Sequence, residues 1–463
     1  MFAFYIFHIV LVVVLIVCGL VKGRSILSPV MLFTICSSYL FYADFAVRGY
    51  NDPFVDSMPS GILINYQLVV LVVYLSGIGY AWTRPVRELN ARMNWVLQQQ
   101  EPLNPFAAQF FGWTSVIAEI TKRLYATHWN LSDAIDASLA PRGHNPWSSA
   151  RGAVGDGTFV YNVIFFLLPA AGICFATLVA DSKERLLRRV ISFAGFTAIF
   201  LLLLTYGGRT YVAIPILYLV LRYLLSSVTR WKKIAMVVAS SLVIVLSFSF
   251  LFLYRAEGLS KGLSQDEDKP AVAYHQDDTY YRTLNAEFLS EHGSRHLNPG
   301  LFFYVIAVNP IPRFFWGNKP ALLDDYFGEY KRYYFMISFL GELVALFGIA
   351  GGTVIAIAFS VFFYHIIEWS ARQKFITWPL GIGVYMMLAL YAYRCMRSLL
   401  NLTVSIYLVI GIIAFSYAMH RLNVSVSRRN NDGRLKSGRF TPALTGALPG
   451  RYYGVPTKRG RAV

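Results

Sequence analysis

The segment 307–320, AVNPIPRFFWGNKP, brings basic, aromatic and proline residues together in a chain that is otherwise rich in apolar runs. Backbone in contact with lipid cannot be irregular, because its polar groups would have no hydrogen-bond partners. The segment is therefore expected at a membrane face or along a cavity. Arginine and lysine beside aromatic rings favour a site that holds an anionic group next to a sugar or an apolar tail. These residue types indicate chemistry on a lipid phosphate.

Arginine also recurs in the turns between apolar runs. Arg209 lies in the turn Gly-Gly-Arg-Thr with no acid nearby, and Arg394 and Arg397 lie three residues apart in a second tight turn. A guanidinium group stays charged at physiological pH and forms forked hydrogen bonds to phosphate oxygens. These arginines are therefore candidates for binding a pyrophosphate. For other arginines of this kind, an ion pair or snorkelling to the interface is the alternative.

Glu342 opens an apolar run that reads Gly-Glu-Leu-Val-Ala-Leu-Phe-Gly. A carboxylate there could act as general base for a sugar hydroxyl, and an acid in a first helical turn also complements the helix dipole. The sequence leaves both roles open. Gly348 and Gly352 form a GxxxG pattern, which we interpret as close helix packing.

The elements that must position these residues are membrane helices. Hydrophobic residues make up 56% of the 463-residue chain and charged residues only 14%, which excludes a water-soluble domain. The four cysteines lie within or beside apolar runs and have no CxxC spacing, so neither a disulfide framework nor a zinc site is predicted. The run Phe2 to Val21 lacks a basic n-region and a small-residue cleavage site, which predicts a retained first span.

Apolar runs long enough to cross roughly 30 Å of hydrocarbon predict about eleven transmembrane helices in an all-α fold. The run 106–126 gives the weakest signal, because Glu119, Lys122 and Arg123 interrupt it. The predicted spans are 2–21, 26–47, 62–82, 106–126, 158–180, 190–207, 211–226, 234–253, 343–367, 376–393 and 399–419.

Basic residues predict which way these spans face, since Lys and Arg accumulate in short cytoplasmic loops. Both 83–105 and 181–189 carry basic clusters. An even number of crossings must separate two cytoplasmic loops, so 106–126 has to span despite its charges. The N-terminus is then on the outside, and the one long external loop is 254–335. A connection of that length usually carries function.

The chain after 420 is predicted to be a separate unit. Residues 1–420 form the transmembrane domain, and 421–463 form a basic tail with ten Lys or Arg and one acid, about half of the net charge of +17. Its Gly, Pro, Ser and Asn content predicts a disordered cytoplasmic tail lying on anionic lipid headgroups. The basic charge therefore reflects topology and tail, and no nucleic-acid partner is predicted.

Three stretches together resemble the oligosaccharide repeat-unit polymerases, the Wzy-type O-antigen polymerase family. They are TYGGRTYVAIPILYL (205–219), PIPRFFWGNKP (310–320) and FLGELVALFGIAGG (339–352). Their order matches as well: a Gly-Arg turn between two mid-chain spans, a long external loop that ends in a Pro, Trp, Lys-Pro motif, a Gly-Glu helix start and a late external arginine. The resemblance covers about residues 190–420. It implies a GT-C-like membrane glycosyltransferase of the bacterial inner membrane.

The resemblance also implies a reaction and its residues. Members of the family transfer a growing glycan from undecaprenyl pyrophosphate to a new lipid-linked repeat unit at the periplasmic face, in the synthesis of O-antigen, capsule or exopolysaccharide. Pyrophosphate binding falls to Arg209, Arg255, Arg282, Arg313, Lys319, Arg394 and Arg397. Catalytic roles fall to Glu342, Arg209 and Arg313, and contacts to sugar or lipid to Phe315 and Trp316. A flippase and a chain-length regulator of the same pathway are the implied protein partners, beside membrane lipid.

Guanidinium groups placed in a water-poor cleft can stabilise a pyrophosphate leaving group without a metal, so a metal-independent enzyme without cofactor is predicted. Two other functions remain open. An O-antigen ligase or another lipid-phosphosugar glycosyltransferase would use an external histidine as base, with His275 and His292 as candidates. A polysaccharide or lipid transporter would show internal repeats and polar residues at mid-membrane, and neither is evident.

Overall fold

The computed structural model describes residues 10–11, 13–15, 17–18, 28–38, 60–84, 100–139, 157–181, 184–205, 209–225, 231, 235, 239, 243, 298–308, 311, 316, 338–399 and 401–436. Every regular element in these residues is helical, which confirms an all-α architecture for this part of the chain. Within the described residues, three helices are long and apolar enough to cross a membrane: α10 (Leu186–Leu204), α16 (Phe339–Arg372) and the portion of α19 (Ile406–Lys436) that ends at Ser425.

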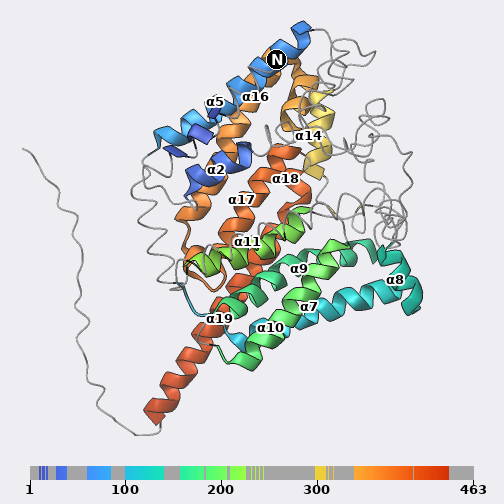
Figure 1. Cartoon of the computed structure of the whole chain (residues 1–463), viewed down its shortest axis with the longest axis vertical. Helices are drawn as coiled ribbons and strands as arrows, with labels where there is room; N and C mark the ends of the chain where they lie inside the picture. Colours follow the sequence, from blue (N-terminus) through green and yellow to red (C-terminus); the bar gives the residue numbers. More distant parts are fainter. Residues whose placement is uncertain are drawn as a thin grey trace, which may run out of the picture. The chain divides into compact units, whose positions relative to one another are not determined.

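One group of helices is built around α9 (Gly157–Ala180), which packs against α7 (Pro105–Ala126), α10 and α11 (Arg209–Leu225). These helices lie side by side in Figure 1, and the short helix α8 (Leu131–Leu139) follows α7. The ring of Phe175 on α9 lies against Gly112 of α7 and Gly195 of α10, where a side chain at either glycine would collide with it. The two glycines therefore allow one aromatic ring to join three helices.

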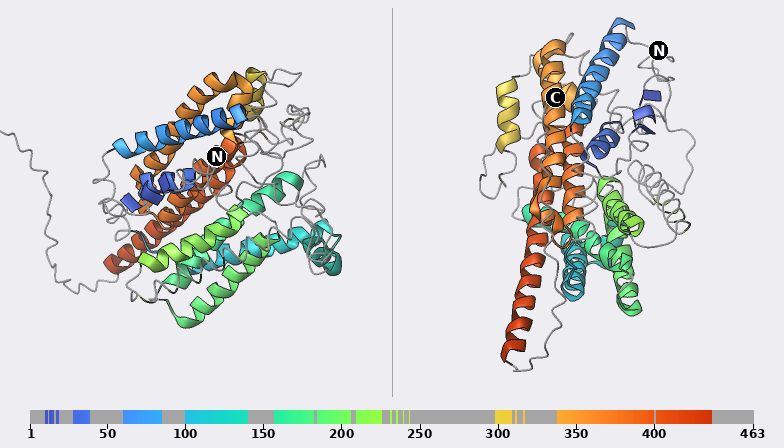
Figure 2. Two further views of the ribbon diagram at one scale, coloured as in Figure 1. Left: turned by 45° about the horizontal axis from the view of Figure 1, so that its top comes forward. Right: turned by 90° about the vertical axis from the view of Figure 1, so that its left-hand side faces the viewer.

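A second group consists of α2 (Pro29–Ser38), α5 (Ser60–Thr83), α16 and α17 (Gly381–Arg397). Figure 2 shows α5 running alongside α16. The turn from α16 to α17 contains the short 3-10 helix η5 (Lys374–Thr377). Two small helices, α14 (Pro299–Val308) and α18 (Asn401–Val404), pack against each other, and α18 also packs on α17.

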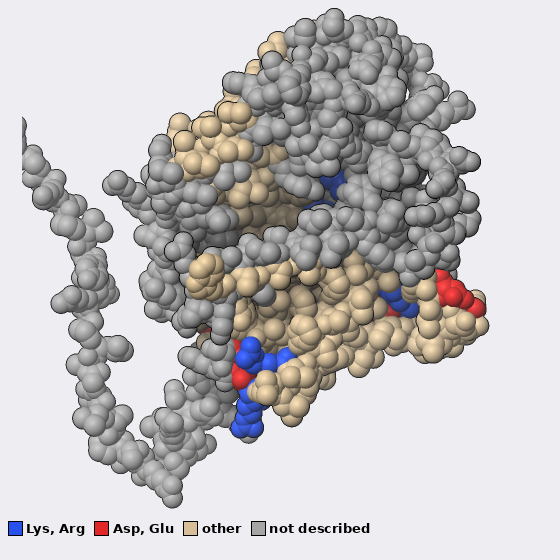
Figure 3. Space-filling model, viewed as in Figure 1, with Lys and Arg blue, Asp and Glu red and all other residues tan. Residues whose placement is uncertain are grey.

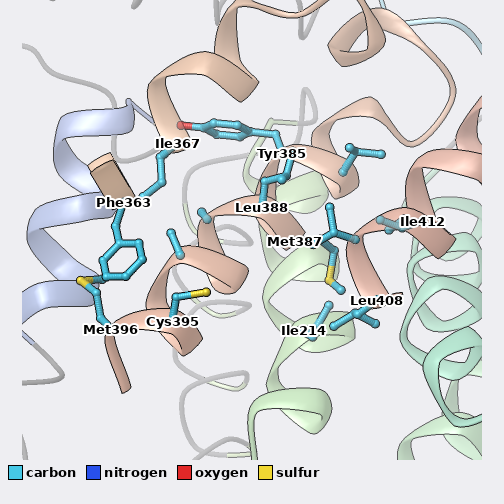
Figure 4. Close-up of a cluster of buried hydrophobic side chains, with 14 of the residues drawn as sticks. Ile214, Phe363, Ile367, Tyr385, Met387, Leu388, Cys395, Met396, Leu408 and Ile412 are labelled. Atoms are coloured by element: carbon cyan, nitrogen blue, oxygen red, sulfur yellow. The ribbon is translucent and has the colours of Figure 1, made fainter. Parts of the chain in front are cut away.

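The apolar core continues across both groups. Figure 4 shows Phe363 and Ile367 of α16 near residues of α17, while Leu408 and Ile412 of α19 lie near Ile214 of α11. All five of these side chains are buried. Close packing of these side chains stabilises the fold through many van der Waals contacts. The core thus joins segments that are up to about two hundred residues apart in the sequence.

Helix α7 carries its charges inward. Glu119 is completely buried, and Lys122 and Arg123 are nearly so, whereas Phe106 and Phe110 on the other face are 78% and 67% exposed. In Figure 3 the lower part of the described surface shows charged side chains at two places, with uncharged residues between them. The charges that weaken the hydropathy of 106–126 are therefore turned away from the apolar face of the helix.

Helix α16 is bent at Gly348, whose φ of 72° and ψ of 175° are not helical. Residues other than glycine are strained in this backbone conformation. A Cβ at Gly352 would lie 2.6 Å from the Cα of Val344, so this glycine lets the two halves of the same helix approach each other. The GxxxG pattern predicts close helix packing, and in the structure its two glycines lie at a bend within the single helix α16.

The chain divides into two units, Met1–His420 and Arg421–Val463. The predicted tail also begins at 421, but helix α19 ends only at Lys436. Residues 421–436 of the predicted tail are therefore helical in the structure, as the continuation of the helix that begins at Ile406. Residues 437–463 lie outside the described part, as does most of the predicted loop 254–335.

Candidate functional site

Glu342 lies in the first turn of α16, behind an N-cap in which the Ser338 side chain accepts a hydrogen bond from the Gly341 amide. Its carboxylate is buried and points at the end of α17. One oxygen accepts a hydrogen bond from Ser398 Oγ at 2.5 Å, and the other accepts the Leu399 amide at 2.7 Å. Both carboxylate oxygens are thus used to hold the turn after α17, which favours a positioning role over a free general base.

Arg394 lies on the last turn of α17, one helical turn before the residues that hydrogen-bond to Glu342. Its Nη1 donates a hydrogen bond to the hydroxyl of Tyr211, and its Cζ lies 4.8 Å from the centroid of the Tyr211 ring. Phe165 packs edge-on against the same ring, with centroids 4.6 Å apart. One aromatic side chain therefore fixes the guanidinium both through its hydroxyl and through its π face.

Tyr211 also connects the two arginine turns that the sequence singles out. It follows Arg209, the first residue of α11, by two positions. The contact between Tyr211 and Arg394 therefore brings the start of α11 to the end of α17, as expected if both turns lie on one side of a membrane. The Arg209 side chain is outside the described part, so the structure places only its backbone.

Arg397 is the last residue of α17 and is partly exposed. It immediately precedes Ser398, so the hydrogen bonds to Glu342 also hold the backbone that carries this arginine. Two arginines in a last helical turn complement the negative end of the helix dipole.

The segment 307–320 begins in the last turn of α14, which ends at Val308. Helix α14 packs against α18, which packs on α17 (Figure 1). The ring centroids of Phe303 of α14 and Phe347 of α16 are 6.4 Å apart. Trp316 is half-buried. The remaining predicted residues of the long loop lie outside the described residues, namely Arg255, Arg282, Arg313, Phe315 and Lys319.

A buried ion cluster at the end of α7 was not predicted as part of the site. Glu119 pairs with Lys122 at 2.6 Å and with Arg123 at 2.8 Å. Arg123 further donates to Ser138 Oγ of α8 and to the carbonyl of Leu202 near the end of α10, both at 3.0 Å. A cation at a helix C-terminus is favourable. This cluster fixes the end of α10, from which the chain turns toward Arg209.

We call the helix ends described so far the site end, defined by Glu342, Arg394, Tyr211 and Arg123. The other ends of the helices form a second network, the opposite end. There Glu101 pairs with His420 at 2.8 Å, its amide donates to the Thr377 carbonyl, and Arg222 donates to the side chain of Gln100. His420 stacks on Trp378 with ring planes 11° apart. The segment before α7 is thereby joined to α11, α19 and the turn before α17.

Sequence reasoning did not find Tyr211, Phe165 or Ser398. The only signal available for Tyr211 was its place two residues after Arg209, and aromatic residues are too common here for that to decide. Within the described residues no group of three potential metal ligands comes together. What the site end offers chemically is an oriented guanidinium at the end of a helix, beside a second arginine and a carboxylate that holds the turn.

No protein-family model matches the chain, and no match was found among curated proteins or solved structures. The fold and site therefore define the class only as an all-helical chain, in its described part, with three helices long and apolar enough to cross a membrane.

Proposed function

We propose that the chain is a membrane glycosyltransferase that polymerises oligosaccharide repeat units carried on undecaprenyl pyrophosphate, at the periplasmic face of the bacterial inner membrane. The observation that carries the proposal is the contact of Arg394 with Tyr211, which joins two arginine-bearing turns from distant parts of the sequence. Arginines gathered at one helix end suit a substrate with two adjacent phosphates. The sequence resemblance supplies the substrate class.

In the proposed reaction the acceptor hydroxyl oxygen attacks the anomeric carbon of the donor sugar and gives up its proton to a base. The bond between that carbon and the pyrophosphate oxygen breaks, and undecaprenyl pyrophosphate leaves with the electron pair. Negative charge therefore grows on the leaving group in the transition state. Arg394, Arg397 and Arg209 stabilise it best if they are already in place before the bond breaks. The Tyr211 hydroxyl and ring keep Arg394 in that position.

The proposed topology has eleven spans, a periplasmic N-terminus and a cytoplasmic C-terminus. The contacts described at the site end join segments that this topology assigns to the periplasmic side, and those at the opposite end join segments that it assigns to the cytoplasm. Helix α7 runs from one network to the other. Its 22 residues extend about 33 Å, enough to cross the hydrocarbon. This supports α7 as a span in spite of its charges.

The site is proposed to be recessed below the membrane surface. Helix α17 has 17 residues and therefore extends only about 25 Å, less than the roughly 30 Å thickness of the hydrocarbon core. If Gly381 lies at the cytoplasmic boundary, Arg394 lies several ångströms inside the periplasmic one. A recessed, water-poor position strengthens the interaction of guanidinium with phosphate.

The test is a polymerisation assay with full-length protein in nanodiscs and a synthetic undecaprenyl-pyrophosphate repeat unit, in the presence of EDTA. Wild type is expected to give a ladder of products. We expect Arg394→Gln and Arg209→Gln each to reduce the rate by at least about tenfold, because each removes a charge-assisted contact to the leaving group.

Arg188→Gln is the matched control. Arg188 pairs with Glu184 at 2.6 Å at the opposite helix ends, so its removal should leave the ladder unchanged. A wild-type protein that forms no ladder with its host's repeat unit, or a ladder indifferent to Arg209 and Arg394, would contradict the proposal. Transfer of a single glycan to a lipid acceptor would point to the ligase instead.

A further inference from the structure

Arg84 is a cation that forms no ion pair with an Asp or Glu of the described residues. It follows the last residue of α5 and is half-buried. Its Nη2 donates to the hydroxyl of Tyr80, and its Cζ lies 4.7 Å from the centroid of that ring. Its Nε is buried without a hydrogen-bond partner, and among the described residues no Asp or Glu forms an ion pair with it. A partly buried charge in this state lacks compensation.

The neighbouring helix does not supply the missing charge. Tyr80 is joined to His365 of α16 at 2.7 Å, His365 lies 3.3 Å from Glu368, and Glu368 pairs with Arg372 at 2.5 Å. Either Tyr80 or His365 Nε2 can donate in their contact, while His365 Nδ1 faces the Glu368 carboxylate. Within the described residues, Glu368 is the carboxylate of this network, and it forms an ion pair with Arg372.

The surface next to this cluster is apolar and aromatic. Phe362, His365, Trp369 and Arg372 are spaced by three, four and three residues, so they lie along one stripe of α16. Phe362 and Trp369 are 49% and 53% exposed, and the Arg372 side chain is 54% exposed. Exposed aromatic rings that lead to a basic helix end match a phospholipid, whose acyl chains meet the rings and whose phosphate meets the cations.

We propose that this end of α5 and α16 binds the phosphate of an anionic membrane phospholipid, with Arg84 as the principal contact and Arg372 at the rim. The phosphate supplies the negative charge that Arg84 lacks, through hydrogen bonds to a guanidinium already fixed by Tyr80. A zwitterionic lipid carries its own ammonium group and compensates less. The site lies at the opposite end from the proposed catalytic arginines and does not depend on the proposed function.

Native mass spectrometry of the full chain in detergent tests this. Wild type should bind phosphatidylglycerol more tightly than phosphatidylcholine, and Arg84→Gln should weaken phosphatidylglycerol binding by about tenfold or more. Arg372→Gln should cause a smaller loss. Arg188→Gln is the matched control, because Arg188, like Arg372, pairs with a glutamate four residues earlier and should leave lipid binding unchanged. Melting temperatures in phosphatidylcholine verify that the variants fold.

Three results would overturn the proposal: equal binding of the two lipids by wild type, equal phosphatidylglycerol binding by Arg84→Gln and wild type, or displacement of the lipid by soluble glycerol phosphate at comparable concentrations. The last would identify a site for free phosphate. If Arg84→Gln does not fold, Arg84→Lys compared with Arg188→Lys carries the test. Lysine keeps the charge without the forked geometry, so a severalfold loss is expected at Arg84 and none at Arg188.

Discussion

Arg394 and Glu342 show how single side chains organise the site end. One tyrosine fixes Arg394 through its hydroxyl and its ring, and one carboxylate holds the backbone just after Arg397. Both interactions orient groups before any substrate arrives. Preorganised charge of this kind is effective in catalysis, because it needs no rearrangement when the leaving group becomes negative.

At this scale the carboxylate of Glu342 can be tested directly. Glu342→Ala removes the acceptor of the buried Ser398 hydroxyl and Leu399 amide, so we expect a loss of about 2 kcal/mol in the free energy of unfolding, measured by thermal unfolding in detergent. Ser398→Ala removes one of the two bonds and should cost less. A general base would behave differently: Glu342→Gln would abolish polymerisation at an unchanged melting temperature.

At the scale of elements, α7 illustrates how a helix can bury charge on one face only. Glu119, Lys122 and Arg123 neutralise one another in part and reach α8 and α10, while the apolar residues of the other face stay exposed. Such an arrangement suits a helix between protein and lipid.

Glu119→Gln should therefore be strongly destabilising. It leaves two buried cations without their carboxylate, and breaking a buried pair in this way typically costs 3–5 kcal/mol. Glu184→Gln is the comparison, because Glu184 pairs with the partly exposed Arg188 with the same four-residue spacing and should cost less than about 1 kcal/mol. Similar melting temperatures for the two variants would contradict the buried cluster.

The bend in α16 makes a second prediction for an element. Gly348→Ala places a Cβ in open space, but at a φ of 72° that only glycine adopts without strain, so a loss of about 1–3 kcal/mol is expected. Gly79→Ala also adds a Cβ in open space, within helical backbone, and should be neutral or stabilising. Thermal unfolding of the two variants tests this prediction. Equal melting temperatures for Gly348→Ala and Gly79→Ala would argue against the bend.

At the scale of the whole molecule, the proposed topology can be measured by cysteine labelling in a cysteine-free background. Ser132 at the start of α8 and Lys374 in η5 are both exposed and belong to opposite ends of the helices. In cells with a permeabilised outer membrane, a membrane-impermeant maleimide should label Ser132→Cys and spare Lys374→Cys. Lys374→Cys should react once the inner membrane is opened. The reverse pattern, or labelling of both, would refute the topology.

Sequence alone determined the features that depend on local composition. Apolar runs and the placement of Lys and Arg predicted a helical chain, and the all-helical part of that prediction is confirmed in the described residues. Counting the predicted membrane crossings also placed the turns with Arg209 and Arg394 on the same side of the membrane, which stays a prediction. These properties follow from the free energy of transferring each segment to lipid, which does not require knowledge of the partner helix.

Tertiary structure decided what depends on partners. From the sequence, Glu342 could be a general base or an acid that complements the helix dipole. The hydrogen bonds from Ser398 and Leu399 favour a positioning role. The role of Gly348 also became clear only in the structure, because a GxxxG sequence pattern is the same whether the glycines allow two helices to pack or one helix to bend. Tyr211 and Arg394 are 183 residues apart. Contacts across such separations depend on how whole helices pack, which short sequence patterns do not encode.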